Sequence, residues 1–231
     1  MSSRKSPYYP IYLDLQDREV LIVGGGDVCA RKAEGLMRCG ARVTVVSPAN
    51  VAKIQRWGEE GRLTLHQRLY AGSDIEGKTL VVAATNDPSV NAGIAKECRR
   101  RLVLVNVVDG ADPGDYVVPA IVEQGSIQIA VSTGGNSPAL ARKLREDLLQ
   151  LVGPEYSEVA EIMGSLRDAA KRVLPTDAKR KRFFDSLLDG PLLELLKGGR
   201  RREAGAEVIR ACTEAGIAPG ELVMQLANGP R

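Results

Sequence analysis

A run of three glycines is the feature of this sequence best suited to binding a phosphate group. The run and its two followers are Gly24, Gly25, Gly26, Asp27 and Val28. An apolar, β-rich stretch (residues 19–23) precedes them and a helical pattern follows, so Gly24 would make a tight turn and Gly26 would let the backbone approach a pyrophosphate. The anion would rest against the helix N-terminus. Cys29, still a small residue, takes the third glycine position. We predict a dinucleotide site; a merely tight strand–helix turn is the alternative.

The end of the next expected strand is where a Rossmann-type protein usually holds the adenosine ribose. An Asp or Glu normally grips the 2′-hydroxyl there, but this chain has Ser47-Pro48-Ala49. We therefore expect the ribose contact to come from the Ser47 hydroxyl or from the backbone of Pro48 and Ala49. NAD is favoured because no arginine follows immediately, while Lys53 and Arg56 keep NADP as an alternative.

Polar residues also follow the later apolar runs. Thr85 and Asn86 end one run, on the side where ligands bind in open α/β sheets. They are predicted cofactor contacts, or else only a helix-capping turn. Asn106 lies in the last run of the sheet and Asp109 follows it. A carboxylate at this place could face the reacting part of a cofactor and move a proton, and a hydrated turn is the alternative.

A second glycine-containing turn precedes a long amphipathic helix. It consists of Ser132, Thr133, Gly134, Gly135, Asn136 and Ser137. Hydroxyls and free N–H groups before a helix that begins near Pro138 suit an anion. Arg142, Lys143 and Arg145 follow within two turns, so a polycarboxylate ligand would fit. An ordinary capped surface helix is the alternative.

Composition excludes several kinds of site. The 231 residues contain one histidine, His66, and four scattered cysteines without a C-x-x-C pair. A Cys/His zinc site and a histidine-based triad are therefore not expected, and we predict no metal site. The net charge of +3 does not indicate nucleic-acid binding. No apolar run approaches the roughly 20 residues of a membrane span, and residues 1–10 do not resemble a signal peptide, so we expect a cytoplasmic protein.

The pattern of elements indicates an α/β fold. Apolar strand-like runs alternate with helical runs through residues 19–108, which predicts a parallel, Rossmann-type sheet. Two further strand-like runs, residues 116–122 and 127–131, flank Gly125-Ser126 as in a hairpin. Everything beyond Gly153-Pro154 appears helical up to about residue 197. In the tail, residues 198–231, we predict one or two weak helices.

Taken together, the motifs resemble one known family. In order they are VGGGDVCARKAEGL (residues 23–36), AATND (83–87), NVVD (106–109) and VSTGGNSPALARKLRE (131–146), after an opening YPIYL (9–13). This combination is similar to the precorrin-2 dehydrogenase module of sirohaem synthase, in its free-standing form. The resemblance covers roughly residues 8–190, and Cys29 departs from the alanine common in that family.

The resemblance implies a function and a division of the chain. The family oxidises precorrin-2 to sirohydrochlorin with NAD in sirohaem biosynthesis, and some members also insert ferrous iron or cobalt into the product. Its important aspartate matches Asp109. Asn106, Arg142 and the turn at residues 132–137 would then contact the tetrapyrrole.

The expected domains are an NAD-binding Rossmann domain (1–112), a small α+β segment for dimerisation and the tetrapyrrole cleft (113–150), a helical domain (151–197) and a tail of unknown role (198–231). A homodimer is expected. The competing hypothesis is an NAD-sensing regulatory protein without catalysis.

Overall fold

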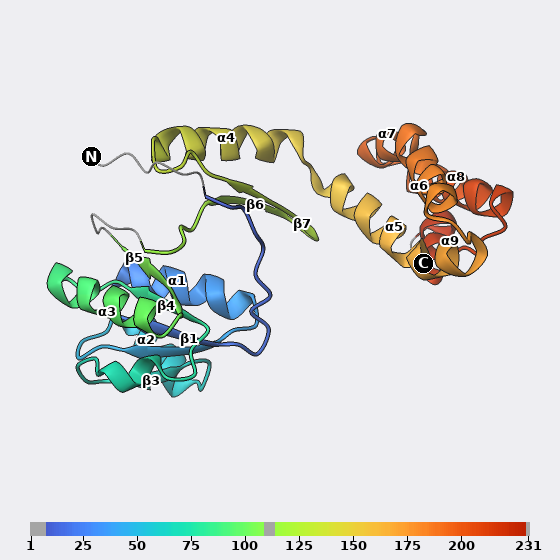
Figure 1. Ribbon diagram of the computed structural model, residues 1–231. Coiled ribbons are helices and arrows are strands. Elements are labelled where there is room, and N and C mark those ends of the chain that lie inside the picture. The colour runs from blue at the N-terminus through green and yellow to red at the C-terminus, as the bar shows by residue number, and fades with distance from the viewer. Residues whose placement is uncertain (1–7, 109–113, 230–231) are drawn as a thin grey trace. The chain divides into compact units, whose positions relative to one another are not determined.

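The chain divides into two compact units. The computed structural model describes residues 8–108 and 114–229, and its first unit ends at Val118 while the second begins at Pro119. The first unit is a parallel sheet with helices, and the second joins a hairpin to a helical bundle (Figure 1). The expected α/β class, with a Rossmann-type sheet before a helical part, is confirmed.

The described residues of the first unit form a five-stranded parallel sheet in the order β3-β2-β1-β4-β5. The strands are β1 Glu19–Val23, β2 Arg42–Val46, β3 Thr64–His66, β4 Leu80–Ala83 and β5 Leu104–Val107. The chain moves outward in one direction from β1 to β3 and then crosses to β4 on the other side of β1. Such a reversal opens a crevice at the carboxyl ends of β1 and β4, where ligands bind in open α/β sheets.

Alternate side chains of the strands pack against helices on opposite faces of this sheet. Val20 and Ile22 of β1 pack with α1 (Asp27–Arg38) and α2 (Ala52–Glu59). Leu21 and Val23 pack instead with α3 (Pro88–Arg100) and the short η1 (Gly72–Ile75). All four β1 side chains are almost fully buried. Burial on both faces explains why these strands are continuous in apolar residues.

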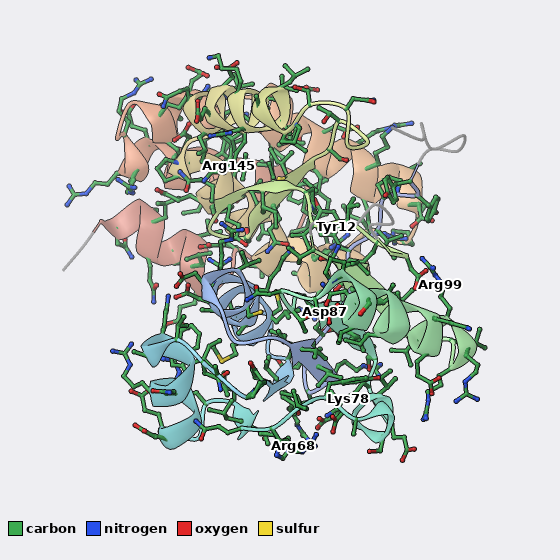
Figure 2. The ribbon with its side chains drawn as sticks, turned by 90° about the vertical axis from the view of Figure 1, so that its left-hand side faces the viewer. Tyr12, Arg68, Lys78, Asp87, Arg99 and Arg145 are labelled. Carbon is green, nitrogen blue, oxygen red and sulfur yellow. The ribbon has the colours of Figure 1, made fainter. Side chains whose placement is uncertain are left out.

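The second unit begins with the expected hairpin. Strands β6 (Ala120–Gln124) and β7 (Ile127–Val131) pair antiparallel around Gly125-Ser126. Helix α4 (Pro138–Leu151) packs along them, and the Arg145 guanidinium of α4 donates to the Ile121 carbonyl of β6 at 2.8 Å (Figure 2). At the turn, the Ser126 N–H donates to the hydroxyl of Ser157 in α5 (Pro154–Val173) at 3.0 Å.

The tail is part of the helical core, which differs from the expectation of a separate segment with weak helices. Helices α6 (Asp177–Asp189), α7 (Leu192–Lys197), α8 (Arg201–Glu214) and α9 (Glu221–Asn228) share one apolar cluster with α5. Val208 and Cys212 of α8 and Val223 of α9 are completely buried. Gly205 has no side chain, which lets α8 approach the Ala227 backbone of α9 closely. These helices form although their local sequence signals are weak, because tertiary packing supplies most of their stability.

Two sequence-based boundaries shift for physical reasons. The first strand of the hairpin was expected from residue 116, but β6 starts at Ala120. Asp115 and Tyr116 pack against β5 and the core of the first unit instead, and Pro119 cannot donate to a sheet. The first unit consequently extends to Val118 rather than ending at residue 112.

None of the helices in the described ranges 8–108 and 114–229 is long and apolar enough to cross a membrane. All four cysteines are unpaired, as expected; Cys29, Cys98 and Cys212 are buried and Cys39 is exposed.

Leu102, in the turn between α3 and β5, has a backbone conformation that disfavours its side chain. Its φ is +58° and its surface is 93% exposed. Burial of the side chain therefore contributes little free energy to offset the left-handed backbone conformation. That conformation costs an L-residue about 1–2 kcal/mol, and glycine avoids the penalty. We predict that Leu102→Gly stabilises the protein by about 1 kcal/mol, measured as a rise in Tm of about 2–4 °C. Leu69→Gly, at an exposed site without positive φ, should not stabilise; equal changes would contradict the strain argument.

Candidate functional site

Gly24 lies between the ends of β2 and β4, the two strands that flank β1. Its φ is +127°, and its N–H donates to the Val46 carbonyl of β2 at 3.0 Å. A Cβ at this position would collide with the Ala84 carbonyl oxygen after β4 and would lie 2.8 Å from the Cys29 Sγ. Burial raises the pKa of the Cys29 thiol, and the protonated thiol donates to the same Ala84 carbonyl at 3.5 Å. The turn therefore requires glycine for both its φ and its close packing.

Gly25 is the point where the glycine turn meets the turn after β2. A Cβ on Gly25 would overlap the Ala49 carbonyl oxygen and crowd the side-chain oxygens of Ser47 and Asn50. The Gly25 carbonyl also accepts from the Val51 N–H at 2.8 Å. Gly25 is thus fixed by packing between two loops, a role that the sequence motif did not distinguish from ligand binding.

Gly26 and the start of α1 leave an open surface. A Cβ on Gly26 would meet no atom within 4 Å, in contrast to both preceding glycines. Gly26 is the N-cap of α1, and no described side chain caps the helix. The first N–H groups of α1 and the helix dipole are thus available to an anion, and the next residues are exposed Asp27 and half-buried Val28. This arrangement fits the pyrophosphate of a dinucleotide.

The predicted ribose residues form a compact turn after β2. Ser47 is buried, and its hydroxyl donates to the Ala49 carbonyl at 2.7 Å, so its proton is already engaged. Pro48 and Ala49 are exposed. Asn50, which the sequence motif did not single out, donates from Nδ2 to the Ser47 carbonyl at 3.2 Å, while its Oδ1 is buried without a described donor. An Asn four residues after a strand end is a turn signal that could have suggested this role.

The two cations near this turn each have a carboxylate partner. The Lys53 ammonium lies 3.0 Å from Glu34 of α1 and 4.9 Å from the centre of the Trp57 ring. Arg56 lies 3.5 Å from Glu60. Both cations are therefore partly neutralised before a ligand arrives.

In the turn after β4, Thr85 is bound to Asn91, and the cofactor contacts predicted for Thr85 and Asn86 stay a prediction. Asn91 of α3 accepts from the Thr85 N–H at 3.0 Å and from its hydroxyl at 2.8 Å, and donates to its carbonyl at 3.0 Å. Asp87 caps α3 (Figure 2), and its bonds from the Ser89 hydroxyl and from the Ser89 and Val90 N–H groups lower its pKa. Asn86 is exposed beside them. The sequence analysis missed Asn91, a buried polar residue within a helix pattern.

The chain that follows β5 comes back to this strand at Gly114 and Asp115. Asp109, the predicted catalytic residue, lies outside the described residues. The return is fastened to β5 at Gly114, which bridges Asn106, and at Asp115. Asp115 donates its N–H to the Val105 carbonyl at 2.7 Å and accepts the Val105 N–H on its carboxylate at 3.2 Å. Asn106 is buried, and its amide donates to the Tyr116 carbonyl at 3.0 Å, so its substrate role stays a prediction.

The second predicted site belongs to the second unit. Thr133 and Ser137 close the turn, because the Thr133 hydroxyl donates to the Ser137 carbonyl at 3.0 Å and accepts the Ser137 N–H at 3.1 Å. Gly134 and Gly135 have positive φ. The Ser137 hydroxyl caps α4 by accepting the Leu140 N–H at 3.2 Å.

The side chains around this turn differ in whether they already have hydrogen-bond or ion-pair partners in the protein. The Ser132 hydroxyl accepts the Gly134 N–H at 3.2 Å, and Asn136 is exposed. Arg142 is exposed on α4 and forms no ion pair with a described residue, whereas Lys143 pairs with Asp147 and Arg145 binds the hairpin. Arg142 is therefore the cation of this helix that remains available to an anion.

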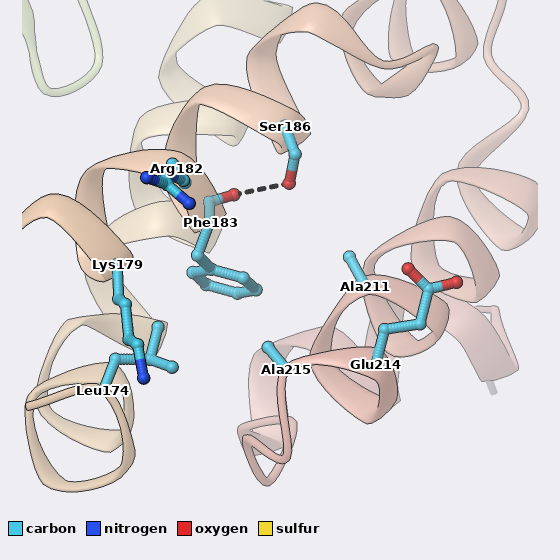
Figure 3. Close-up of a pocket in the computed structure, with 8 residues that line it drawn as sticks. All are labelled: Leu174, Lys179, Arg182, Phe183, Ser186, Ala211, Glu214 and Ala215. Carbon is cyan, nitrogen blue, oxygen red and sulfur yellow. Dashed lines mark hydrogen bonds between the residues drawn. The ribbon is translucent and has the colours of Figure 1, made fainter.

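A shallow hollow of about 290 Å³ lies elsewhere, between α6 and α8 (Figure 3). Its lining comprises Leu174, Lys179, Arg182, Phe183, Ser186, Ala211, Glu214 and Ala215. None of the predicted site residues lines it. Within the described ranges, no group of three or more His, Cys, Asp or Glu side chains could hold a metal ion.

The first unit thus has the sheet order, open glycine turn and crevice of a dinucleotide-binding Rossmann protein. Family models agree with this class: residues 11–120 match a family described as NAD(P)-binding. Residues 124–151 match the central region of sirohaem biosynthesis proteins, and residues 155–211 match the sirohaem synthase dimerisation region. A nicotinamide cofactor is therefore supported for this chain.

Individual relatives agree with the three models. The chain is 38% identical to the siroheme synthase of Methylococcus capsulatus over 90% of its own length and 44% of the relative, and 36% identical to that of Chromobacterium violaceum over 96% and 47%. It thus spans about half the length of these curated relatives. The solved structure of SirC, a precorrin-2 dehydrogenase, matches with a TM-score of 0.73 and 27% identity over 88% of this chain and 100% of SirC. The chain is therefore similar to sirohaem synthases over about half of their length and to SirC over the whole of its length.

The contrast between Gly25 and Gly26 can be tested directly. Gly26→Ala places a methyl group in open space over the start of α1, so folding should persist while dinucleotide affinity falls at least about tenfold. Gly25→Ala places it against the Ala49 carbonyl, so the protein should lose about 2 kcal/mol of stability or more. Thermal unfolding and calorimetric titration with NAD measure both effects. Unchanged NAD affinity in folded Gly26→Ala would contradict the proposed anion site.

Proposed function

We propose that this protein oxidises precorrin-2 to sirohydrochlorin with NAD, as a step of sirohaem biosynthesis. The observation that carries the proposal is the open glycine turn at Gly26, in a chain that aligns with the whole of the precorrin-2 dehydrogenase SirC. The family models add that the second unit is similar to sirohaem biosynthesis proteins at residues 124–151 and 155–211, while the model for residues 11–120 is described as NAD(P)-binding.

The reaction removes two hydrogens from the tetrapyrrole, one as a hydride and one as a proton. The nicotinamide, when bound, accepts the hydride. The Gly26 backbone and the start of α1 bind the pyrophosphate, and the crevice beside Thr85 and Asn86 orients the rest of the cofactor. Asp109 is the proposed proton acceptor, or it orients a pyrrole N–H. The described residues nearest to it in the chain are fastened by hydrogen bonds of Asn106 and Asp115.

Charge near the ribose turn supports NAD rather than NADP. A 2′-phosphate needs a cation, and the two nearest candidates, Lys53 and Arg56, are each paired with a glutamate. Binding NADP would require Lys53 to leave both Glu34 and the Trp57 ring. The ribose of NAD needs only the backbone around Pro48 and Ala49 and the polar atoms of the turn.

The second unit is proposed to form a homodimer and to contact the substrate. Helix α4 buries only Ala141, while Leu140, Leu144 and Leu151 are 50%, 40% and 66% exposed. At about 100° per residue these three lie on one side of the helix, and a second copy could cover them. The model for the dimerisation region matches residues 155–211, so the dimer role expected for residues 113–150 stays a prediction. Arg142 and the turn at residues 132–137 are the proposed contacts for the substrate's carboxylates.

Insertion of ferrous iron or cobalt into the product remains a further prediction. In that reaction the metal would be a substrate, and the macrocycle would supply its nitrogen ligands. Asp109 would then be the candidate to receive the pyrrole protons.

The proposal is tested by anaerobic incubation of the purified protein with precorrin-2 and NAD. We expect one NADH per precorrin-2 and the spectrum of sirohydrochlorin. Binding of NAD without turnover would instead favour the regulatory NAD sensor. Asp109→Asn should keep its NAD affinity and lose about 100-fold or more in kcat, because proton transfer contributes on this scale. Turnover equal to that of the wild type would remove Asp109 from the mechanism.

Cofactor choice gives a second test. We predict that the wild type binds NAD at least about tenfold more tightly than NADP. Glu34→Gln should release Lys53 and strengthen NADP binding several-fold without a change for NAD, as measured by fluorescence titration with each reduced cofactor. Glu59→Gln is the matched control, because Glu59 is exposed and forms no ion pair with a described residue. Equal effects of both variants would contradict a specific role for the Glu34–Lys53 pair.

A further inference from the structure

Lys32 is a half-buried cation that the functions above do not use. It lies in the middle of α1, the helix that follows the glycine turn. Burial lowers the pKa of its ammonium, and the neighbouring Arg31 lowers it further. The Lys32 side chain forms no ion pair or hydrogen bond with a described residue. A desolvated charge without a counter-ion is unfavourable. A charged side chain at position 32 therefore needs an explanation.

The two sides of α1 are occupied differently. Glu34 marks the side that faces α2, because it pairs with Lys53. Lys32 is two residues away and therefore about 200° around the helix. On its own side it has Val28 and Leu36, one turn in each direction. Leu36 packs into the apolar cluster that α1 and α2 share.

The sheet on this side of α1 is formed by β4 and the chain that follows β5. Val82 of β4 and Ala84 after it face the same cluster as α1, together with Val108 and Tyr116. The helical members of this cluster come from α1 and α2. On the side of α1 that faces away from α2, Val108 and Tyr116 therefore cover this face of the sheet. This side of the crevice lies next to Asn106 of β5.

The direction of the side chain takes its charge toward the crevice. Side chains on a helix lean toward its N-terminus and lie over the preceding turn. From its position in α1, the Lys32 side chain is therefore expected to lean toward Val28, two residues after Gly26 and its open surface at the helix start. A lysine on this flank can meet an anion that lies beside the pyrophosphate, next to the ends of β4 and β5.

We propose that Lys32 binds a carboxylate of the tetrapyrrole substrate and is a specificity-determining residue for it. This inference rests on the proposed function, whose substrate carries acetate and propionate side chains around its rings. The N–H groups at the start of α1 serve the pyrophosphate on the helix axis, whereas Lys32 serves an anion on the flank that faces β4 and β5. The substrate carboxylate supplies the counter-ion that the folded chain lacks.

The test compares Lys32→Met, which removes the charge and keeps the length, with Lys32→Arg, which keeps the charge. Lys96→Met, on exposed α3 surface, is the matched control. We expect Lys32→Met to raise the KM for precorrin-2 about tenfold with kcat and NAD affinity nearly unchanged, and Lys32→Arg to restore most of the loss. Tm should not fall and should rise slightly, because an unpaired desolvated charge is removed; a purely structural lysine would show the opposite.

A stable probe separates this proposal from the proposed function. Fluorescence titration with uroporphyrin, which carries eight carboxylates, should show about tenfold weaker binding to Lys32→Met than to the wild type or Lys96→Met. That result would support the carboxylate contact even if the wild type failed to oxidise precorrin-2, in which case only the proposed reaction would fail. The proposal would be overturned by unchanged uroporphyrin affinity or by an equal effect in Lys96→Met. A loss of NAD affinity in Lys32→Met would also overturn it, because it would assign Lys32 to the cofactor's pyrophosphate.

Discussion

Backbone packed directly against backbone is the constraint on which the first unit depends. Gly24 and Gly25 bring the chain leaving β1 into contact with the chain leaving β4 and the chain leaving β2, respectively. Any side chain at either position would push these loops apart. Because the three loops are fixed together, the start of α1 and the surface over Gly26 have one arrangement, and an anion can be bound without a large loss of loop entropy.

The sequence predicted the parallel sheet well because its strands are buried on both faces and its turns contain glycine or proline. The same reasoning found the hairpin at Gly125-Ser126 and the helix that begins at Pro138. It predicted only one or two weak helices in the tail and did not show that α8 and α9 belong to the helical core, because their stability comes from mutual packing at Gly205 and Val208. It also extended the first hairpin strand to residue 116, since nothing local reveals that Tyr116 packs into the core of the preceding unit.

The candidate site was predictable where glycine spacing carries the information and less so where side-chain partners do. The run Gly24 to Val28 has the expected place between strand and helix. The sequence could not show that the Ser47 proton is engaged by Ala49, that Asn91 holds Thr85, or that Lys53 is paired with Glu34. The last two pairings depend on residues from another element, and the first depends on the exact shape of the turn. Pairing of this kind decides which polar groups remain available to a ligand, and it is visible only in three dimensions.

The fastening of Gly114 and Asp115 to β5 has a consequence for solubility. β5 is an outer strand of the sheet, and such strands offer unpaired N–H and C=O groups to other chains. Here the Val105 N–H is taken by the Asp115 carboxylate, the Val105 carbonyl is taken by the Asp115 N–H, and Gly114 bridges Asn106. A carboxylate in place of a neighbouring strand ends the hydrogen-bonding ladder with a charge. The segment at Gly114 and Asp115 therefore also blocks this edge of the sheet against intermolecular strand pairing.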